Sequence, residues 1–108
     1  MTDWQIEFFD QAVEDALRGM PKDIQARFQR IVELIAMFGL ESIREPYVKH
    51  LEGKLWEMRV KGRDGIARAI YVTATPRRVI ILTVFRKKTQ KTPKRELDLA
   101  RQRAREVT

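Results

Sequence analysis

The sequence predicts an α+β domain in which an N-terminal αα-hairpin packs on a small, mostly antiparallel sheet and a helix follows the last strand. Three observations predict this class. Apolar residues recur at helical spacing between residues 10 and 39, they alternate with polar residues after residue 54, and helical spacing returns after residue 92. The length of 108 residues and the hydrophobic fraction of 44% suit one core, so we expect a single domain over residues 1–108.

A short strand and two helices are expected at the N-terminus. Residues 4–8 alternate apolar and polar side chains, as half-buried strands do. Asp10 is a suitable N-cap for a first helix that ends near Gly19. Pro21 suits the start of a second helix, and Gly39 suits its end. Two helices with a short join form a hairpin that can cover one face of a sheet.

A three-strand meander is expected next. Residues 55–60 alternate, and Asp64-Gly65 supplies the turn before a second strand at residues 66–73. A third strand, residues 79–85, is apolar on both faces, as in a strand that is covered on both sides. Residues 40–53 are expected to be an irregular connection.

A cationic loop and a helix are expected at the C-terminus. Residues 86–91 read Arg-Lys-Lys-Thr-Gln-Lys and follow the third strand. Thr92 is predicted as the N-cap and Pro93 as the first residue of the final helix.

The charge is unevenly distributed along the chain. The net charge is +7, but residues 1–40 hold 4 Lys/Arg against 7 Asp/Glu, whereas residues 41–108 hold 18 against 8. A basic field of this size attracts phosphate polymers, with strong salt dependence. The segregation favours an anionic partner over a merely soluble surface.

Composition excludes several classes of site. The chain has no cysteine, so it has neither a disulfide framework nor a cysteine metal site, and one histidine cannot form a histidine metal site alone. The apolar runs are too short to cross a bilayer, and acidic residues stand where a signal peptide is basic. We therefore expect a cytoplasmic protein that has no membrane partner, metal or other cofactor.

Two strand arginines and the cationic loop form the candidate site. Arg59 lies on the polar side of its strand, and Arg68 lies mid-strand between two alanines, where an unpaired charge is costly. With Lys87 and Lys88, they are expected to converge on the face of the sheet that the helical hairpin leaves open, where they could grip a phosphate backbone. The alternative is a structural salt bridge between the arginines and an acid, with three candidates: Glu52, Glu57 and Asp64.

Two aromatic residues and the histidine are further candidates. Trp56 and Tyr71 could stack on unpaired bases, although Trp56 shares the apolar side with Met58 and fits a core position better. Histidine is the residue type whose unperturbed pKa lies near neutrality, so His50 could act as a general acid or base, or be incidental. The sequence contains no Gly-rich phosphate loop and no serine nucleophile elbow, and no carboxylate pair has metal-ligand spacing, which removes most enzyme classes.

Three segments carry a resemblance to a known family. Residues 49–59 (KHLEGKLWEMR), 68–71 (RAIY) and 85–93 (FRKKTQKTP) resemble the RelE/HigB-like toxins of type II toxin–antitoxin systems, in the phage-derived branch. The resemblance covers nearly the whole chain in element order. It implies a RelE-like fold and a toxin that cuts mRNA in the ribosomal A site without metal, through attack by the 2′-hydroxyl. It also implies a cognate helix-turn-helix antitoxin as the partner.

The resemblance also implies roles for individual residues. The catalytic candidates are Arg59, Arg68, Lys88 and His50, and the RNA-binding candidates are Lys49, Lys54, Lys87, Lys91 and Tyr71. Several ribonuclease members carry a catalytic Tyr or His near the C-terminus, whereas residues 86–108 contain neither. The acid and base roles then fall to His50, Tyr71 or a lysine, or are absent. Two alternatives therefore remain, a ParE-like inhibitor of DNA gyrase and a non-toxic phage-derived domain that binds nucleic acid.

Overall fold

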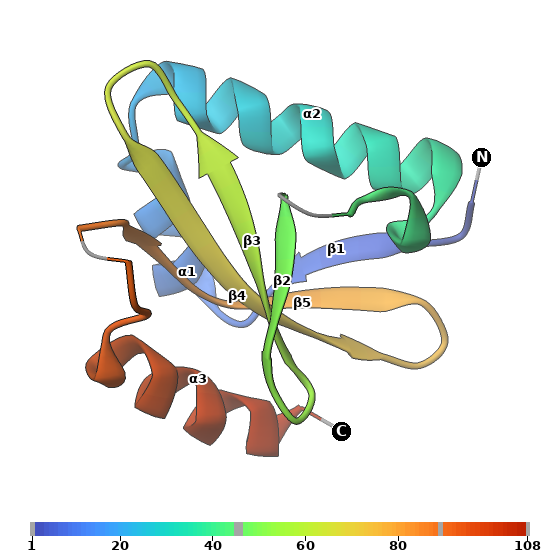
Figure 1. The fold of residues 1–108 in the computed structure, drawn as a ribbon. Helices are drawn as coiled ribbons and strands as arrows, with labels where there is room; N and C mark the ends of the chain where they lie inside the picture. Colours follow the sequence, from blue (N-terminus) through green and yellow to red (C-terminus); the bar gives the residue numbers. More distant parts are fainter. Residues whose placement is uncertain (1, 45–46, 89, 108) are drawn as a thin grey trace.

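The structure of the chain is a computed structural model that describes residues 2–44, 47–88 and 90–107. Within these ranges, three α-helices, one 3₁₀ helix and five strands follow one another in the order shown in Figure 1. The elements are β1 (Gln5–Phe8), α1 (Gln11–Arg18), α2 (Lys22–Phe38), η1 (Leu40–Ser42), β2 (Val48–Glu52), β3 (Leu55–Lys61), β4 (Ile66–Ala74), β5 (Arg78–Arg86) and α3 (Lys94–Glu106). The predicted α+β class is confirmed.

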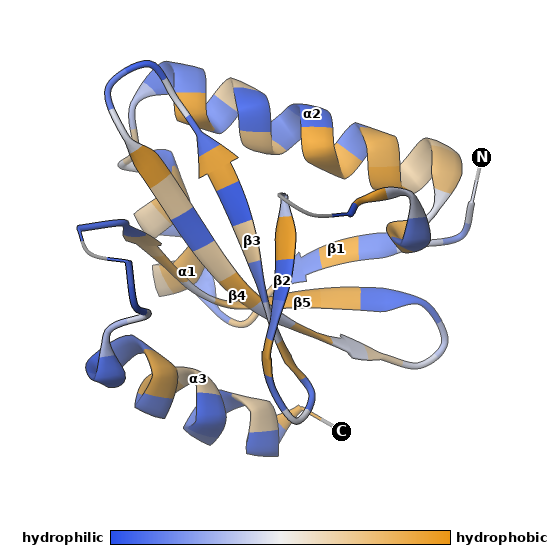
Figure 2. Ribbon diagram, viewed as in Figure 1, coloured by the Kyte–Doolittle hydropathy of each residue, from blue (hydrophilic) through white to orange (hydrophobic). Residues whose placement is uncertain are grey.

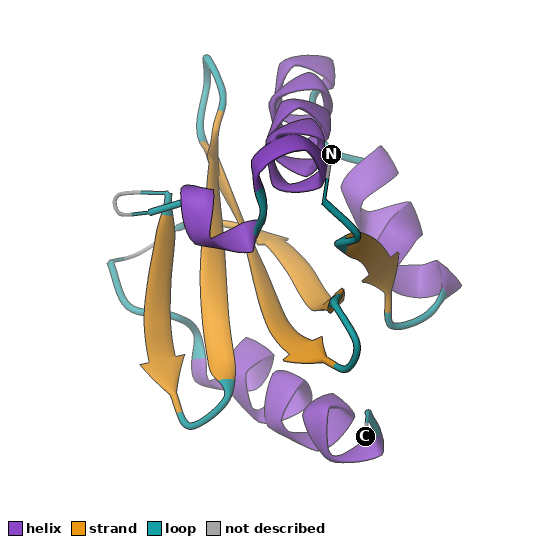
Figure 3. Cartoon of the chain, turned by 90° about the vertical axis from the view of Figure 1, so that its right-hand side faces the viewer, coloured by secondary structure: helices purple, strands orange, loops and turns teal. Residues whose placement is uncertain are grey.

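The strands form one mixed sheet in the order β1-β5-β4-β3-β2. The pairs β2–β3, β3–β4 and β4–β5 are antiparallel, with β2 at one edge of the sheet. Strand β1 forms the opposite edge and runs parallel to β5. Helices α1 and α2 lie on one side of this sheet and α3 lies on the other (Figures 1 and 3). We call these two sides the hairpin face, which carries Met58, Ala69 and Ile81, and the α3 face, which carries Ile70, Ile80 and Leu82.

The ends of the helical hairpin follow from local chemistry. The Oδ1 atom of Asp10 accepts a hydrogen bond of 3.0 Å from the Val13 N–H, which caps α1 as predicted. Gly39 has φ of 92°, a region that favours glycine, and its N–H donates to the Ile35 carbonyl at the end of α2. The predicted start of α1 at Asp10 and the predicted end of α2 at Gly39 are therefore confirmed.

Each face of the sheet has its own apolar core. Buried residues of α1 and α2, among them Val13, Phe28 and Ile35, pack on the hairpin face. Ala100 of α3 packs on the α3 face, and the orange stripe of α3 in Figure 2 turns toward the sheet while its blue side faces outward. The two central strands β4 and β5 are thus covered on both sides, as predicted for the third strand of the meander.

Strand β2 corrects the expectation of an irregular connection over residues 40–53. Val48 faces the core, but Lys49 and His50 are both exposed, so these neighbours lack a clean alternation of apolar and polar residues. An edge strand is held largely by its backbone ladder to the next strand, here β3, and such pairing leaves a weak local signal. Pro46, in the same connection, lies outside the described residues.

Two expectations about the C-terminal helix also change. The α3 face was expected to be open, but α3 covers part of it and leaves only the remainder open. Thr92 is not the N-cap: Pro93 takes that position, and the Thr92 hydroxyl instead donates to Oε2 of Glu57 at 2.9 Å. The helix therefore begins one residue later than predicted, and the threonine contributes to the interior of the site.

Two arginines anchor α3 to the sheet. Arg101 donates to both carboxylate oxygens of Glu52 at 2.8 and 2.6 Å, and this pairing lowers the pKa of Glu52. Arg103 donates to the Leu82 carbonyl at 2.6 Å and lies 5.2 Å from the centroid of the Phe9 ring. Among the described helices, none is both long enough and apolar enough to span a membrane.

Candidate nucleic-acid interface

Arg59 and Arg68 are direct cross-strand neighbours on the α3 face. The register of β3 against β4 pairs them, and Phe85 of β5 lies opposite Arg68. The side chain of Arg59 is 32% exposed, whereas that of Arg68 is 1% exposed. The sequence therefore placed both arginines on one face correctly, but only Arg59 reaches the surface.

A buried carboxylate holds the two arginines. Glu57, 1% exposed, lies with Oε2 3.4 Å from Nη1 of Arg68 and with Oε1 3.8 Å from Nε of Arg59. The 3.8 Å separation is too long for a hydrogen bond, and among the described residues the buried Nε of Arg59 has no hydrogen-bond partner. Of the three acids considered from the sequence, Glu57 is the one that pairs with these arginines. A buried charge pair of this kind costs desolvation and is tolerated because each partner neutralises the other.

The loop between β5 and α3 closes over this ion pair. The Gln90 carbonyl accepts from Nη2 of Arg68 at 3.1 Å, and Thr92 donates to Glu57. Lys87 and Lys88, from the start of the same loop, line a cavity of about 420 Å³ beside the β3–β4 turn. Thr89 lies outside the described residues.

Lys49 completes the group of cations. It lies opposite Glu57 in the β2–β3 ladder, so it projects from the same face as Arg59. We call Lys49, Arg59, Lys87 and Lys88 the cationic cluster. Lys91 belongs to the same loop and is exposed. Within the cluster, Lys49 and Arg59 lie beside Glu57 on β2 and β3. Lys87 and Lys88 belong to the loop whose Gln90 carbonyl accepts from Arg68.

Three candidates from the sequence lie away from the cationic cluster. His50 is paired with Trp56, and their ring centroids are 5.0 Å apart on the hairpin face. Its Nε2 lies 2.7 Å from the carbonyl oxygen of Gly53. Because a carbonyl oxygen can only accept, Nε2 is the donor of this hydrogen bond. Lys54 lies in the β2–β3 turn, at the other end of β3 from Arg59. Neither His50 nor Lys54 can join Arg59 on one phosphate in this arrangement.

Tyr71 is the third of these candidates, and it belongs to the core. It is 3% exposed on the hairpin face, and burial raises the pKa of its phenol to about 12. It therefore stays protonated near neutral pH and has no surface on which a base could stack. Trp56 differs from Tyr71 in the opposite direction: the sequence favoured a core position for it, but it is 38% exposed.

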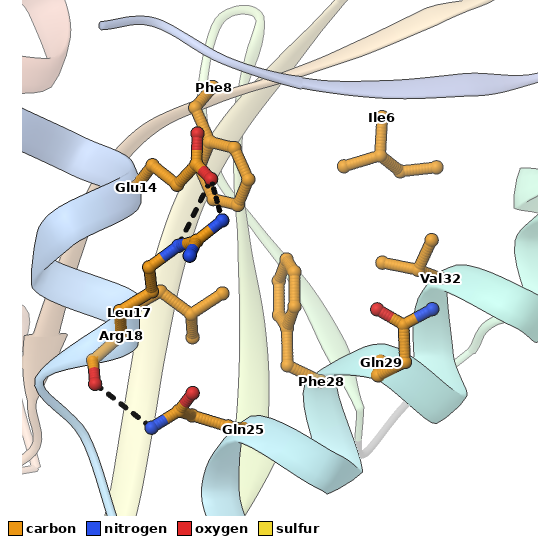
Figure 4. Close-up of a pocket in the computed structure, with 9 residues that line it drawn as sticks. All are labelled: Ile6, Phe8, Glu14, Leu17, Arg18, Gln25, Phe28, Gln29 and Val32. Atoms are coloured by element: carbon orange, nitrogen blue, oxygen red, sulfur yellow. Dashed lines mark hydrogen bonds and ion pairs between the residues drawn. The ribbon is translucent and has the colours of Figure 1, made fainter. Parts of the chain in front are cut away.

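Cavities also lie on the hairpin side. One, of about 390 Å³, lies between η1 and the sheet and is lined in part by Trp4 and Trp56. Another, of about 380 Å³, opens between α1, α2 and β1 (Figure 4). Its apolar side chains include Phe8 and Phe28, and the ion pair of Glu14 with Arg18 lies at its edge. Neither cavity contains a residue of the cationic cluster.

The sequence missed the part of Glu57 and Thr92 in the site. Glu57 was considered only as a salt-bridge partner, and Thr92 only as a helix cap. Glu57 shares the polar side of β3 with Arg59, which is a usable signal, because a carboxylate between cationic residues on one strand face is expected to bind them. Thr92 gave no such signal, since its contact with Glu57 joins residues 35 positions apart.

Comparison with known proteins defines the class first. The chain has a RelE-like fold: it superposes on the crystal structure of an archaeal RelE–RelB complex from Pyrococcus horikoshii OT3 with a TM-score of 0.62 and 22% sequence identity, covering 79% of this chain and 96% of that chain. The family profile described as phage derived protein Gp49-like matches residues 15–105, and the chain belongs to this family. None of the curated proteins compared with the chain matches it significantly.

Proposed function

We propose that the chain is the toxin of a type II toxin–antitoxin system and that it inhibits translation by cutting mRNA on the ribosome. The observation that carries the proposal is the cationic cluster together with the buried Glu57–Arg68 pair, in a member of the Gp49-like family with a RelE-like fold. Cations gathered on one face bind phosphate chains, and guanidinium groups suit the charge that develops during phosphoryl transfer.

The proposed reaction is transesterification within the RNA. The 2′-oxygen loses its proton and attacks the adjacent phosphorus, the bond from phosphorus to the 5′-oxygen breaks, and the departing oxygen takes up a proton. Arg59 and Lys88 stabilise the negative charge of the phosphorane, and one of the loop lysines donates the proton to the leaving oxygen. Because His50 and Tyr71 lie on the hairpin face, we assign the role of proton acceptor to Glu57.

Arg68 has a positioning role in this proposal. Its side chain is buried and contacts Glu57 and the Gln90 carbonyl, so it holds the carboxylate and the loop and does not contact RNA in this conformation. The loop residues Gln90 and Thr92 must move before Glu57 can reach a 2′-hydroxyl. Binding of the RNA phosphates by Lys87 and Lys88, on the same loop, supplies a reason for that movement.

An antitoxin is the proposed protein partner. The similar archaeal structure is named as a complex of RelE with RelB, and we propose an equivalent complex for this chain. An acidic segment of a small helix-turn-helix protein would cover the cationic cluster and exclude RNA. We expect the two proteins to copurify and their affinity to fall with salt concentration.

Induced expression of cluster variants tests the proposed function. Expression of the wild type is expected to arrest growth, and primer extension is expected to show cleaved transcripts. Arg59→Ala and Lys88→Ala should each slow cleavage by about 100-fold or more, because one donor to a developing oxyanion supplies about 3 kcal/mol. Lys22→Ala is the matched control, since Lys22 is exposed at the start of α2 on the opposite side of the sheet and should leave cleavage unchanged. Growth arrest with intact mRNA would contradict the proposal.

Inhibition of DNA gyrase is the second candidate function. It is favoured by one observation, that residues 86–108 contain neither the Tyr nor the His that several related ribonucleases use. This function predicts induction of the DNA-damage response and no effect on translation in an isolated translation system. Harmless expression would exclude both kinds of toxin.

A further inference from the structure

Tyr47 is an exposed aromatic residue at the border of the cationic cluster. It immediately precedes β2 and is 57% exposed. Its carbonyl accepts a hydrogen bond of 2.7 Å from the Arg59 N–H, while its own N–H donates to the Arg44 carbonyl. The β2–β3 register, continued by one residue beyond the Val48–Met58 pair, sets Tyr47 opposite Arg59.

The alternation of the ladder assigns Tyr47 to the α3 face. Val48 is buried against the hairpin face and is paired with Met58 of the same core. Neighbouring residues in a strand project to opposite sides, so Tyr47 and Lys49 project to the side of Arg59. Tyr47 is therefore on the α3 face, whereas Trp56 and Tyr71 are not.

Tyr47, Arg59, Arg68 and Phe85 form one row across the sheet. Neighbouring strands are separated by about 5 Å, so a phosphate on Arg59 would bring the base of the same or the next nucleotide over Tyr47. Proteins that bind single-stranded nucleic acids combine aromatic platforms with cations in this way. Duplex RNA cannot use such a platform, because its bases are already stacked.

We infer that Tyr47 is the base-stacking residue of the RNA site and that the chain takes unpaired RNA, with the phosphate on Arg59 and the adjacent base on the Tyr47 ring. This inference rests on the proposed function and deepens it. It assigns to the site a residue that binds through its aromatic ring and not through charge. It also predicts that the base lies at the β2 edge of the sheet.

Binding of a short single-stranded RNA tests the inference. The probe is a fluorescently labelled 2′-O-methyl oligoribonucleotide, which lacks the attacking hydroxyl, and anisotropy at low salt gives the affinity. Tyr47→Ala is expected to weaken binding by about 5- to 100-fold, as for loss of one base–aromatic stack. Tyr47→Phe and Tyr47→Trp should keep it. Phe38→Ala is the matched control, because Phe38 is 60% exposed at the end of α2, away from the cluster.

Two further measurements separate stacking from other effects. An oligonucleotide that lacks one base opposite Tyr47 should bind wild type and Tyr47→Ala with similar affinity, while the complete oligonucleotide should distinguish them. A series of such probes, each lacking a different base, locates that position. The slope of log affinity against log salt concentration should stay unchanged in Tyr47→Ala. In Lys88→Ala this slope should fall by about one released ion, because Lys88 contacts a phosphate and Tyr47 does not. Circular dichroism and urea unfolding establish that each variant is folded.

The outcomes distinguish this inference from the proposed function. If Lys88→Ala weakens binding and Tyr47→Ala binds like Phe38→Ala, the stacking role is overturned and the phosphate-binding site stands. If Tyr47→Phe loses as much affinity as Tyr47→Ala, the hydroxyl is the contact and stacking is again overturned. If the wild type binds the RNA no better than Lys88→Ala does, both the inference and the proposed RNA site fail.

Discussion

The two faces of the sheet use the same strands in different ways. On the hairpin face, Met58, Ala69 and Ile81 are almost fully buried under α1 and α2. On the α3 face, only the part beneath α3 is apolar, and the next positions along β3 and β4 carry Glu57 and Arg68. Burial of apolar area stabilises the fold, whereas burial of an ion pair contributes little net stability. The difference indicates that the hairpin face maintains the fold, and the polar end of the α3 face is the part to which the proposed function assigns binding.

Removal of one partner of the buried pair gives the largest expected effect. Arg68→Met should lower the free energy of unfolding by about 3–5 kcal/mol, because Glu57 would remain buried without its main counter-ion. The double variant Glu57→Leu/Arg68→Met should recover most of this loss, since neither charge remains. Urea unfolding of both variants gives the comparison.

A surface pair provides the control for this prediction. Arg78 pairs with Glu7 at 2.7 Å, and both side chains are about one-third exposed. Arg78→Met should therefore have a much smaller effect than Arg68→Met. Equal losses in the two single variants, or a double variant as unstable as Arg68→Met, would show that the buried pair is not the distinguishing feature of the α3 face.

Alkaline titration tests the dry character of the hairpin face. The pKa of Tyr71 is raised from 10.0 to about 12, so its contribution to stability is complete below pH 10 and is lost as the pH rises through the folded value. The loss is expected to be on the order of 2 to 3 kcal/mol. Tyr71→Phe should remove this part of the pH dependence in unfolding experiments. An unchanged alkaline slope would mean that the phenol is hydrated in the folded state.

The third prediction concerns the loop between β5 and α3, which the hydrogen bond from Thr92 to Glu57 holds against the sheet. Thr92→Val removes the hydrogen bond to Glu57 with little change in shape and should cost about 1.5–3 kcal/mol, since the acceptor is charged. Hydrogen exchange should increase in residues 90–92 while the amides of α2 stay protected. An increase spread evenly over both regions would argue against a loop that is latched separately.

The smallest expected effect concerns the anchor of α3. Arg101 lowers the pKa of Glu52 below its ordinary value of 4.5, so the pair stabilises the fold above that pH and the contribution is lost as the pH falls through the lowered value. Glu52→Gln should flatten the acid side of the stability profile in urea unfolding and leave the alkaline side unchanged. A wild-type profile that differs from the variant above pH 4.5 and converges with it as the pH falls through the lowered pKa would fit this sign, whereas the reverse pattern would contradict it.

The fold was more predictable than the site, for reasons visible in particular residues. The caps at Asp10 and Gly39 act within one helical turn, so local sequence carried them. The placement of Arg59 and Arg68 on one face followed from strand alternation and the turn at residues 64–65. Their unequal exposure did not, because it depends on Gln90, more than 20 residues away from Arg68 in the chain.

By itself, the sequence determined the α+β class, the order of most elements and the cationic C-terminal region, because periodicity, caps and charge are properties of neighbouring residues. Only the tertiary structure decided that β2 is a strand, that α3 covers the second face, and that Tyr71 is buried while Tyr47 is exposed. The physical reason is that burial and pairing depend on surfaces that meet across the fold. Residues with the same local pattern are therefore separated into core and site only when distant segments pack together.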